Sequence, residues 1–130
     1  MIRFETEYFQ KFSYTENQIK QYFKNAKKDL DAAKKLTDPD IMYRICYDAI
    51  IKLGIATLAK HRYKIRSIPG HHVKILEKLD EIGKLKEEIN FLQYVRRKRN
   101  IDLYDGGVTF TKTESTNLLK ITEKVFQQLS

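Results

Sequence analysis

Apolar residues recur along residues 15–36 with the spacing of one face of an α-helix. Lysine and aspartate side chains fill the opposite face, so the segment is amphipathic. Thr15 is followed three positions later by Gln18, a pair that is typical of a capping box at a helix start. The pattern therefore predicts a helix over residues 15–36. Its apolar face consists of Ile19, Tyr22, Phe23, Ala26, Leu30 and Ala33.

The segment from Ile41 to Ala59 is apolar on almost every side. Asp38 and Pro39 predict its start, because aspartate caps helices and proline is favoured at the first helical position. A helix with so narrow a polar face is expected at the centre of a bundle or in a contact between subunits. Gly54 is expected to allow close approach of a neighbouring helix. The polar column consists of Arg44, Asp48 and Lys52.

A basic segment separates this helix from the next helical region. Residues 61–72 are expected to form a loop, which Pro69-Gly70 interrupts. Apolar residues then return at helical spacing over residues 73–92. Gly83 lies within this stripe and is expected either to divide it into two helices or to kink one helix.

The last part of the chain carries similar signals. Gly106-Gly107 is expected to end one helix, and residues 111–114 form a second capping-box pattern before a final apolar stripe. Residues 1–14 are rich in aromatic side chains, so we expect them to pack as a short helix or an extended arm. Together these elements predict an all-α fold, a four- to five-helix up-and-down bundle over residues 15–130 preceded by an aromatic arm.

The apolar stripe changes character near residue 96. Leu85, Ile89 and Leu92 alternate spacings of four and three, and the same spacing leads to Arg96 and Arg99. A buried charge without a partner costs several kcal/mol, of the order of 3 to 5. Either the seam opens here into a solvated groove, or the arginines meet specific anionic partners. Both alternatives indicate a site.

Composition sharpens this picture. The 130 residues suit one domain, and 25 basic against 17 acidic side chains give a net charge of +8. Such a balance favours contact with phosphates or with an acidic partner. The basic residues concentrate in residues 60–66 and residues 96–99, which would form one positive surface if the fold brings them together.

Several other classes of protein receive no support from the sequence. There is no run of about 18 apolar residues and no secretory signal near Met1, so a membrane span or export is not expected. A single cysteine, Cys46, fits a reducing cytoplasm and is expected to be a small buried side chain. Adjacent His71 and His72 diverge on a helix and lack ligands at suitable spacing, so no metal or other cofactor is expected.

The Arg-rich stretch is the strongest candidate site. On a helix, Arg96, Asn100 and Tyr104 follow one another at intervals of four, and Arg99 lies beside that column. Guanidinium groups suit phosphates, whereas the asparagine and the tyrosine add neutral hydrogen bonds. The competing interpretation is structural. In it, Arg99 pairs with one of two supporting carboxylates and pins helices together; these are Asp102 and Asp48.

The pattern of these residues resembles the HEPN superfamily over roughly residues 15–129. The resemblance implies a bundle of four or five helices, usually a homodimer, often encoded beside a minimal nucleotidyltransferase in toxin–antitoxin or defence systems. Active members are metal-independent ribonucleases, whose motif is an arginine followed after four to six residues by a histidine. The matching segments are residues 26–33, Tyr43…Tyr47-Asp48-Ala49, Gly70-His71 and Arg96…Arg99-Asn100…Asp102…Tyr104-Asp105.

The chain departs from the ribonuclease motif at one decisive position. If Arg99 is the motif arginine, then Tyr104 stands in the place of the histidine. A general base works best with a pKa near the working pH, which histidine offers and tyrosine does not. Some toxin members carry a modified tyrosine two residues after that histidine, and the corresponding position here is Gly106.

The sequence therefore favours binding over catalysis. The first hypothesis is a cytoplasmic protein that forms a homodimer through residues 41–59. It binds a nucleotide, an RNA phosphate or a minimal nucleotidyltransferase. Arg96, Arg99, Asn100 and Tyr104 would form its site. The first alternative is a ribonuclease toxin with a substituted acid–base residue, and the second is a helical scaffold in which the arginines are structural.

Overall fold

The computed structural model describes the backbone of residues 2–105 and 110–130, and the side chains of residues 2–100 and 110–130. Within that part of the chain the fold is all-α with five helices, as predicted, and it also contains one two-stranded ribbon, which was not predicted. The helices are α1 (Glu16–Lys34), α2 (Pro39–Lys60), α3 (His71–Gly83), α4 (Lys86–Asp105) and α5 (Lys112–Leu129). The strands are β1 (Phe9–Lys11) and β2 (Tyr63–Ile65).

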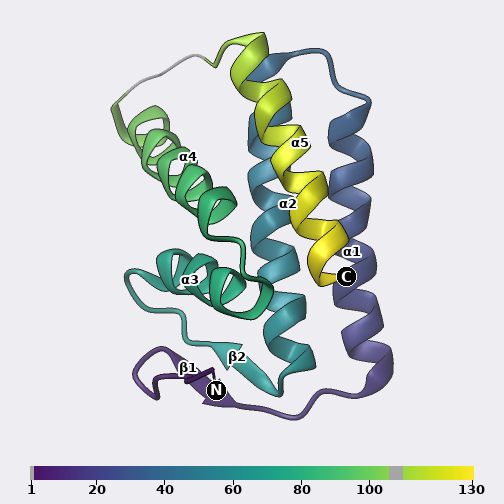
Figure 1. Ribbon diagram of the computed structural model, residues 1–130, viewed down its shortest axis with the longest axis vertical. Coiled ribbons are helices and arrows are strands. Elements are labelled where there is room, and N and C mark those ends of the chain that lie inside the picture. Colours follow the sequence, from purple (N-terminus) through teal and green to yellow (C-terminus); the bar gives the residue numbers. More distant parts are fainter. Residues whose placement is uncertain (1, 106–109) are drawn as a thin grey trace.

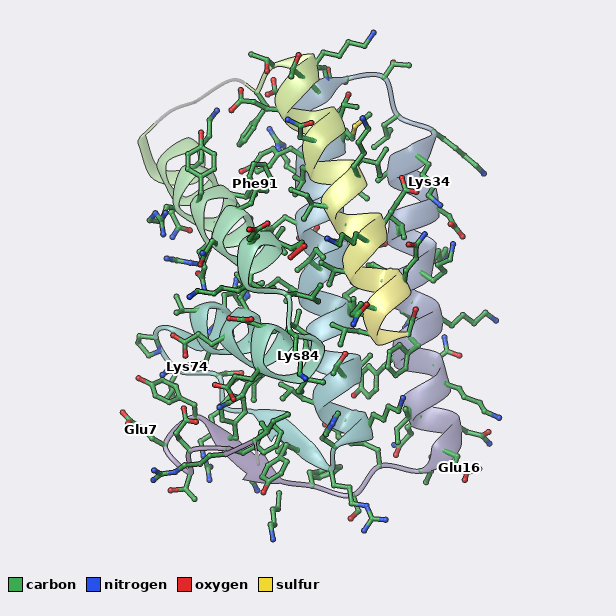
Figure 2. All side chains as sticks on the ribbon, viewed as in Figure 1. Glu7, Glu16, Lys34, Lys74, Lys84 and Phe91 are labelled. Atoms are coloured by element: carbon green, nitrogen blue, oxygen red, sulfur yellow. The ribbon has the colours of Figure 1, made fainter. Side chains whose placement is uncertain are left out.

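The long helices alternate in direction along the bundle. Figure 1 shows α1, α2 and α5 side by side, with α4 on the other side of α2 and α3 lying across its lower part. Phe91 of α4 lies between α4 and α2 in Figure 2, where it packs against the main core. No helix in the described residues is long and apolar enough to cross a membrane.

Helix starts follow the capping signals in the sequence. The Thr15 hydroxyl accepts from the Gln18 amide at 3.1 Å, and the Gln18 side chain accepts from the Thr15 amide at 2.9 Å. Thr111 and Glu114 form the same reciprocal pair at the start of α5. Asp38 caps α2 by accepting from the Asp40 and Ile41 amides. These bonds satisfy amides that have no partner inside the helix.

Helix α2 is the centre of the bundle. It contacts each of the other helices, and its interior side chains are almost fully enclosed. This position explains why α2 is apolar on almost every side. The sequence allowed two explanations, a place at the centre of the bundle or a contact between subunits. Gly54 permits close packing as predicted, because a Cβ there would lie 2.2 Å from the Ile75 Cγ2 atom of α3. Gly83 ends α3, so the apolar stripe of residues 73–92 is divided into two helices.

The N-terminal arm packs in an extended form against residues 61–72. The expectation that those residues form only a loop is wrong. Residues 61–72 are not wholly a loop, because Tyr63–Ile65 form β2 and pair antiparallel with Phe9–Lys11. Phe9 is buried with Leu58 and Ile75 in a small second core. The pairing joins segments more than fifty residues apart, and periodicity over three residues does not reveal it.

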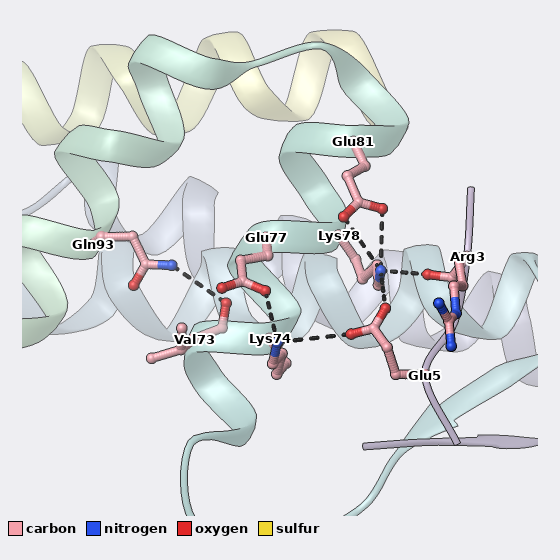
Figure 3. Close-up of polar contacts among 8 residues, drawn as sticks. All are labelled: Arg3, Glu5, Val73, Lys74, Glu77, Lys78, Glu81 and Gln93. Carbon is pink, nitrogen blue, oxygen red and sulfur yellow. Dashed lines mark hydrogen bonds and ion pairs between the residues drawn. The ribbon is translucent and has the colours of Figure 1, made fainter. Parts of the chain in front are cut away.

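A buried lysine fastens the arm to α3. Lys78 is only 2% exposed, and its ammonium group donates to the Arg3 carbonyl, to Glu5 at 2.7 Å and to Glu81 at 3.1 Å. Figure 3 shows these acceptors converging on Lys78 from the arm and from the next turn of α3. The ammonium also lies 5.6 Å from the Phe4 ring centroid and 5.4 Å from that of Phe9. The lysine is thus enclosed by two carboxylates and two aromatic rings.

Replacing Lys78 by methionine should lower the free energy of unfolding by about 2 to 4 kcal/mol. The apolar stem would remain, but Glu5 and Glu81 would lose the cation that compensates their partial burial. Chemical denaturation measures the change, with Lys120→Met on the exposed face of α5 as the matched control. An equal, small effect of both substitutions would contradict the anchoring role.

Candidate functional site

A cleft of about 590 Å³ lies between the start of α3 and the second half of α4. Its volume falls in the range of small-molecule sites, about 300 to 1,000 Å³. One wall comes from the loop after β2 and the first residues of α3, and the other from the Arg-rich part of α4. The lining residues are Ser67, Ile68, Pro69, Gly70, His71, His72, Val73, Arg96, Arg99 and Asn100.

The loop wall is built around Gly70. Gly70 has φ of 85°, a left-handed conformation that glycine adopts without strain, and it precedes the first residue of α3. The His71 amide donates to the Ile68 carbonyl at 3.2 Å, and the His71 Nδ1 atom lies 2.9 Å from the same oxygen. Among the described residues, no side chain caps the first turn of α3. The start of this helix, which carries the positive end of the helix dipole, faces the cleft.

The α4 wall carries the arginines because the row of buried apolar residues shifts to another side of the helix. Leu92 is followed in the core by Val95, three positions on, whereas Arg96 and Arg99 turn to the cleft. The Arg96 Nε donates to the Gln93 side chain at 3.0 Å, and Gln93 in turn donates to the Val73 carbonyl of α3 at 3.3 Å. Both arginines line an open cleft, as the first sequence alternative expects, whereas the side chain of Asp102, one of the anionic partners in the second, lies outside the described residues.

Arg99 is held by an aromatic ring of the core. Its guanidinium carbon lies 5.0 Å from the ring centroid of Tyr47, which is 1% exposed on α2. A ring face attracts the guanidinium without neutralising its charge. Among the described residues, no carboxylate forms an ion pair with Arg96 or Arg99. Among the described residues, both arginines are therefore positioned by neutral groups.

Tyr47 also holds a histidine at the cleft. The Tyr47 hydroxyl and the His72 Nδ1 atom are 2.9 Å apart, and the rings of His71 and His72 meet edge to face at 4.4 Å. Burial, followed by the charges of His71, Arg99 and Arg96, lowers the pKa of His72 to about 4. Burial likewise raises the pKa of Tyr47 to about 12. At neutral pH both rings are uncharged, and Nε2 is the His72 nitrogen that Tyr47 does not use.

The structure describes the side chain of only one of the two carboxylates that were expected to support Arg99. Asp48 lies on the exposed side of α2 and makes no ion pair with Arg99 within the described residues. Desolvation raises the pKa of the Asp48 carboxyl, although Arg99 and Lys52 act against the shift. Lys52 pairs instead with Asp29 at 2.7 Å. The side chains of Asp102 and Tyr104 lie outside the described residues.

The structure thus unites Arg96, Arg99 and Asn100, as the helical spacing predicts. The sequence interpretation missed Tyr47 and His72 as site residues, since it considered the histidine pair only as metal ligands. The proximity of Gly70-His71 to a helix start was the signal that could have found them. Three elements distant in sequence supply these groups, so no local spacing connects them.

The cysteine and the other histidines show no metal site. Cys46 is fully buried, and burial raises the pKa of its thiol to about 12, which confirms the prediction of a small interior side chain. Within the described part of the chain, no cluster of three histidine, cysteine or acidic residues could hold a metal ion.

A comparison with known families agrees with the fold. The family model of the HEPN domain matches residues 19–130, and the chain belongs to this family. The family is associated with nucleotide- and RNA-related functions, often in toxins, and its domains commonly dimerise. No curated protein and no solved structure matches the chain. The whole N-terminal arm, residues 1–14, precedes the matched region.

The shifted pKa of His72 makes stability depend on pH. Between about pH 6.5 and pH 4 the unfolded chain binds a proton at this histidine that the folded chain does not. The free energy of unfolding should therefore fall as the pH is lowered through this window, by about 1 to 2 kcal/mol at pH 5. His72→Gln should flatten the profile between pH 7 and 5 in urea titrations.

The matched control for this profile is His61→Gln. His61 is exposed at the end of α2, away from the residues that line the cleft. If both substitutions leave the same slope, the His72 environment described here is contradicted.

Proposed function

We propose that the protein binds the phosphate of a nucleotide or RNA strand in the cleft between α3 and α4. The observation that supports this proposal most directly is the state of the two cleft arginines. Arg96 is fixed by Gln93, and Arg99 lies over Tyr47, so neutral groups orient both cations toward one space. Two such guanidinium groups offer several parallel N–H donors to phosphate oxygens.

The other cleft groups suit the same ligand. Asn100 adds an amide that can donate to a phosphate or accept from a hydroxyl, and the uncapped start of α3 favours negative charge. Neutral His72 can hydrogen bond to a sugar or base without adding charge. Tyr104 remains a proposed member of the site, which follows from its place eight residues after Arg96.

The scaffold alternative receives less support from the same helix. Lys98 provides a comparison, because it does form a structural ion pair, with Glu114 of α5 at 2.7 Å, and it lies 4.3 Å from the Phe110 ring centroid. This pair ties α4 to α5. The cleft arginines make no such pair among the described residues, so their charges contribute little to holding helices together.

The wider assignment follows from family membership. We place the protein in a toxin–antitoxin or defence system, as a cytoplasmic homodimer with a minimal nucleotidyltransferase as a partner. Because half of the residues of α2 are buried within the bundle, its contribution to a dimer would come from exposed positions such as Ile41, which is 46% exposed. A nucleotidyltransferase reading frame beside this one would support the partner.

Replacing Arg99 by glutamine should weaken binding of a 5′-phosphorylated diuridylate about tenfold, because one charged phosphate contact is lost. Isothermal titration calorimetry measures the affinity. The matched control is Arg97→Gln, which removes the same charge from an exposed residue that does not line the cleft. Equal losses for the two variants would contradict the cleft assignment. Unfolding of Arg99→Gln, with no ligand raising the melting temperature of the wild type, would favour the scaffold.

Cleavage of RNA is the second candidate, and the position of His72 is the observation that favours it. Its chemistry would transfer the 2′-hydroxyl proton to an imidazole as the 2′-oxygen attacks the neighbouring phosphorus. The bond from phosphorus to the 5′-oxygen would break, the leaving oxygen would take a proton, and a 2′,3′-cyclic phosphate would form. Arg96 and Arg99 would stabilise the charge on the phosphoryl oxygens. A pKa near 4 makes His72 a weak base, so binding remains the first proposal.

If the cleft cleaves RNA, then His72→Gln should lower the rate of cleavage of a labelled single strand at least a hundredfold, without changing its affinity comparably. Tyr104→Phe tests the residue at the motif position in the same assay. Gel electrophoresis with a catalytically unrelated control, His61→Gln, reports the products. Intact RNA after long incubation with the wild-type protein would exclude this second candidate.

A further inference from the structure

The ribbon of β1 and β2 presents a basic outer face next to the cleft. Phe9, Tyr63 and Ile65 pack inward with the second core. Strand alternation turns Lys64 to the opposite face, where its cross-strand neighbour is Gln10. β2 then leads, through Arg66, directly into the loop that forms one wall of the cleft (Figure 1).

The cations on this face are held by neutral partners. The Arg66 guanidinium donates to the Thr6 carbonyl at 3.0 Å and to the Gln10 side chain at 3.5 Å. The Lys64 ammonium lies 4.6 Å from the Phe12 ring centroid. Within the described residues neither cation forms an ion pair, whereas the acidic Glu5 of the arm is bound to Lys78. Among the described residues, Lys64 and Arg66 therefore remain unpaired cations on this part of the ribbon. Lys60 and Arg62, nearby in the sequence, are exposed as well, and Glu7 is an exposed acidic residue of the same arm.

An exposed aromatic ring accompanies these cations. Phe12 is 39% exposed, although phenylalanine is usually buried, and its ring lies 4.6 Å from that of Tyr14. Exposed aromatic rings between basic side chains form the platforms on which unpaired bases stack. Duplex bases are already stacked on each other and offer no free face to such a ring.

We propose that a single-stranded RNA segment runs from the cleft along the outer face of the ribbon, with phosphates beside Lys64 and Arg66 and a base stacked on Phe12. This inference rests on the proposed phosphate binding in the cleft and names its ligand as a polynucleotide rather than a free nucleotide. It also gives a role to the N-terminal arm, which precedes the matched HEPN region.

The chain itself limits the length that such a ligand needs. Six residues separate Lys64 from Gly70, so the chain between them spans at most about 22 Å. At about 3.4 Å for each stacked nucleotide, at most about six nucleotides cover this span. A decamer is therefore long enough to contact the cleft and the ribbon together, and we expect a dinucleotide to occupy the cleft.

The experiment compares the affinities of 5′-phosphorylated oligouridylates of two and ten nucleotides by fluorescence anisotropy. The wild type should bind the decanucleotide at least tenfold more tightly than the dinucleotide. Phe12→Ala and Lys64→Gln should each remove most of this difference in affinity while leaving the affinity for the dinucleotide unchanged. Phe12→Trp should restore it, because stacking is retained. Lys28→Gln, on the exposed face of α1, removes the same charge as a control. Lys64→Gln should also reduce the salt dependence by about one phosphate contact.

The possible results separate the two proposals. If Lys64→Gln and Lys28→Gln reduce the affinity for the decanucleotide equally, or if Phe12→Ala has no effect, the proposed RNA path along the ribbon is wrong. A loss of dinucleotide affinity in Arg99→Gln would still support the cleft. If neither oligonucleotide binds, both proposals fall. Tighter binding of duplex RNA than of the decamer would overturn the choice of a single strand. Binding of decaglutamate in place of RNA would indicate an acidic protein partner instead.

Discussion

The cleft depends on Tyr47, a core residue of α2 that contacts both of its walls. Its ring lies under the guanidinium of Arg99, and its hydroxyl meets His72 at 2.9 Å. Because Tyr47 is 1% exposed and α2 is packed against every other helix, these contacts attach the site to the closely packed centre of the bundle. Preorganised groups of this kind lower the cost of ordering a ligand site.

The basic side chains of the protein fall into two groups: some form ion pairs that hold the fold together, and others make no ion pair among the described residues. Lys78 and Lys98 are enclosed and paired, and they fasten the arm and α5 to the bundle. By contrast, Arg96 and Arg99 in the cleft and Lys64 on the ribbon are oriented by amides or rings. The protein has a net charge of +8. The gathering of cations around one cleft, with no ion pair to them among the described residues, is the feature that most favours an anionic ligand.

Much of the fold could be predicted because its signals are local. Thr15, Asp38 and Thr111 cap helices within three residues of themselves, and the apolar stripes identify the buried faces. Strand β2 could not be predicted in the same way, since its pairing with β1 is made across the whole of α1 and α2. The site divides likewise: one helix supplies Arg96, Arg99 and Asn100, whereas Tyr47 and His72 join them only in three dimensions.

The most direct test of the cleft is an NMR titration of the ¹⁵N-labelled protein with a 5′-phosphorylated diuridylate. Saturable shifts of the Arg96 and Arg99 Nε–H signals, together with the amides of His71 and His72, are expected because these groups surround one space. Shifts confined to the exposed lysine face of α1, or shifts that never saturate, would contradict the assignment of the cleft as the phosphate site.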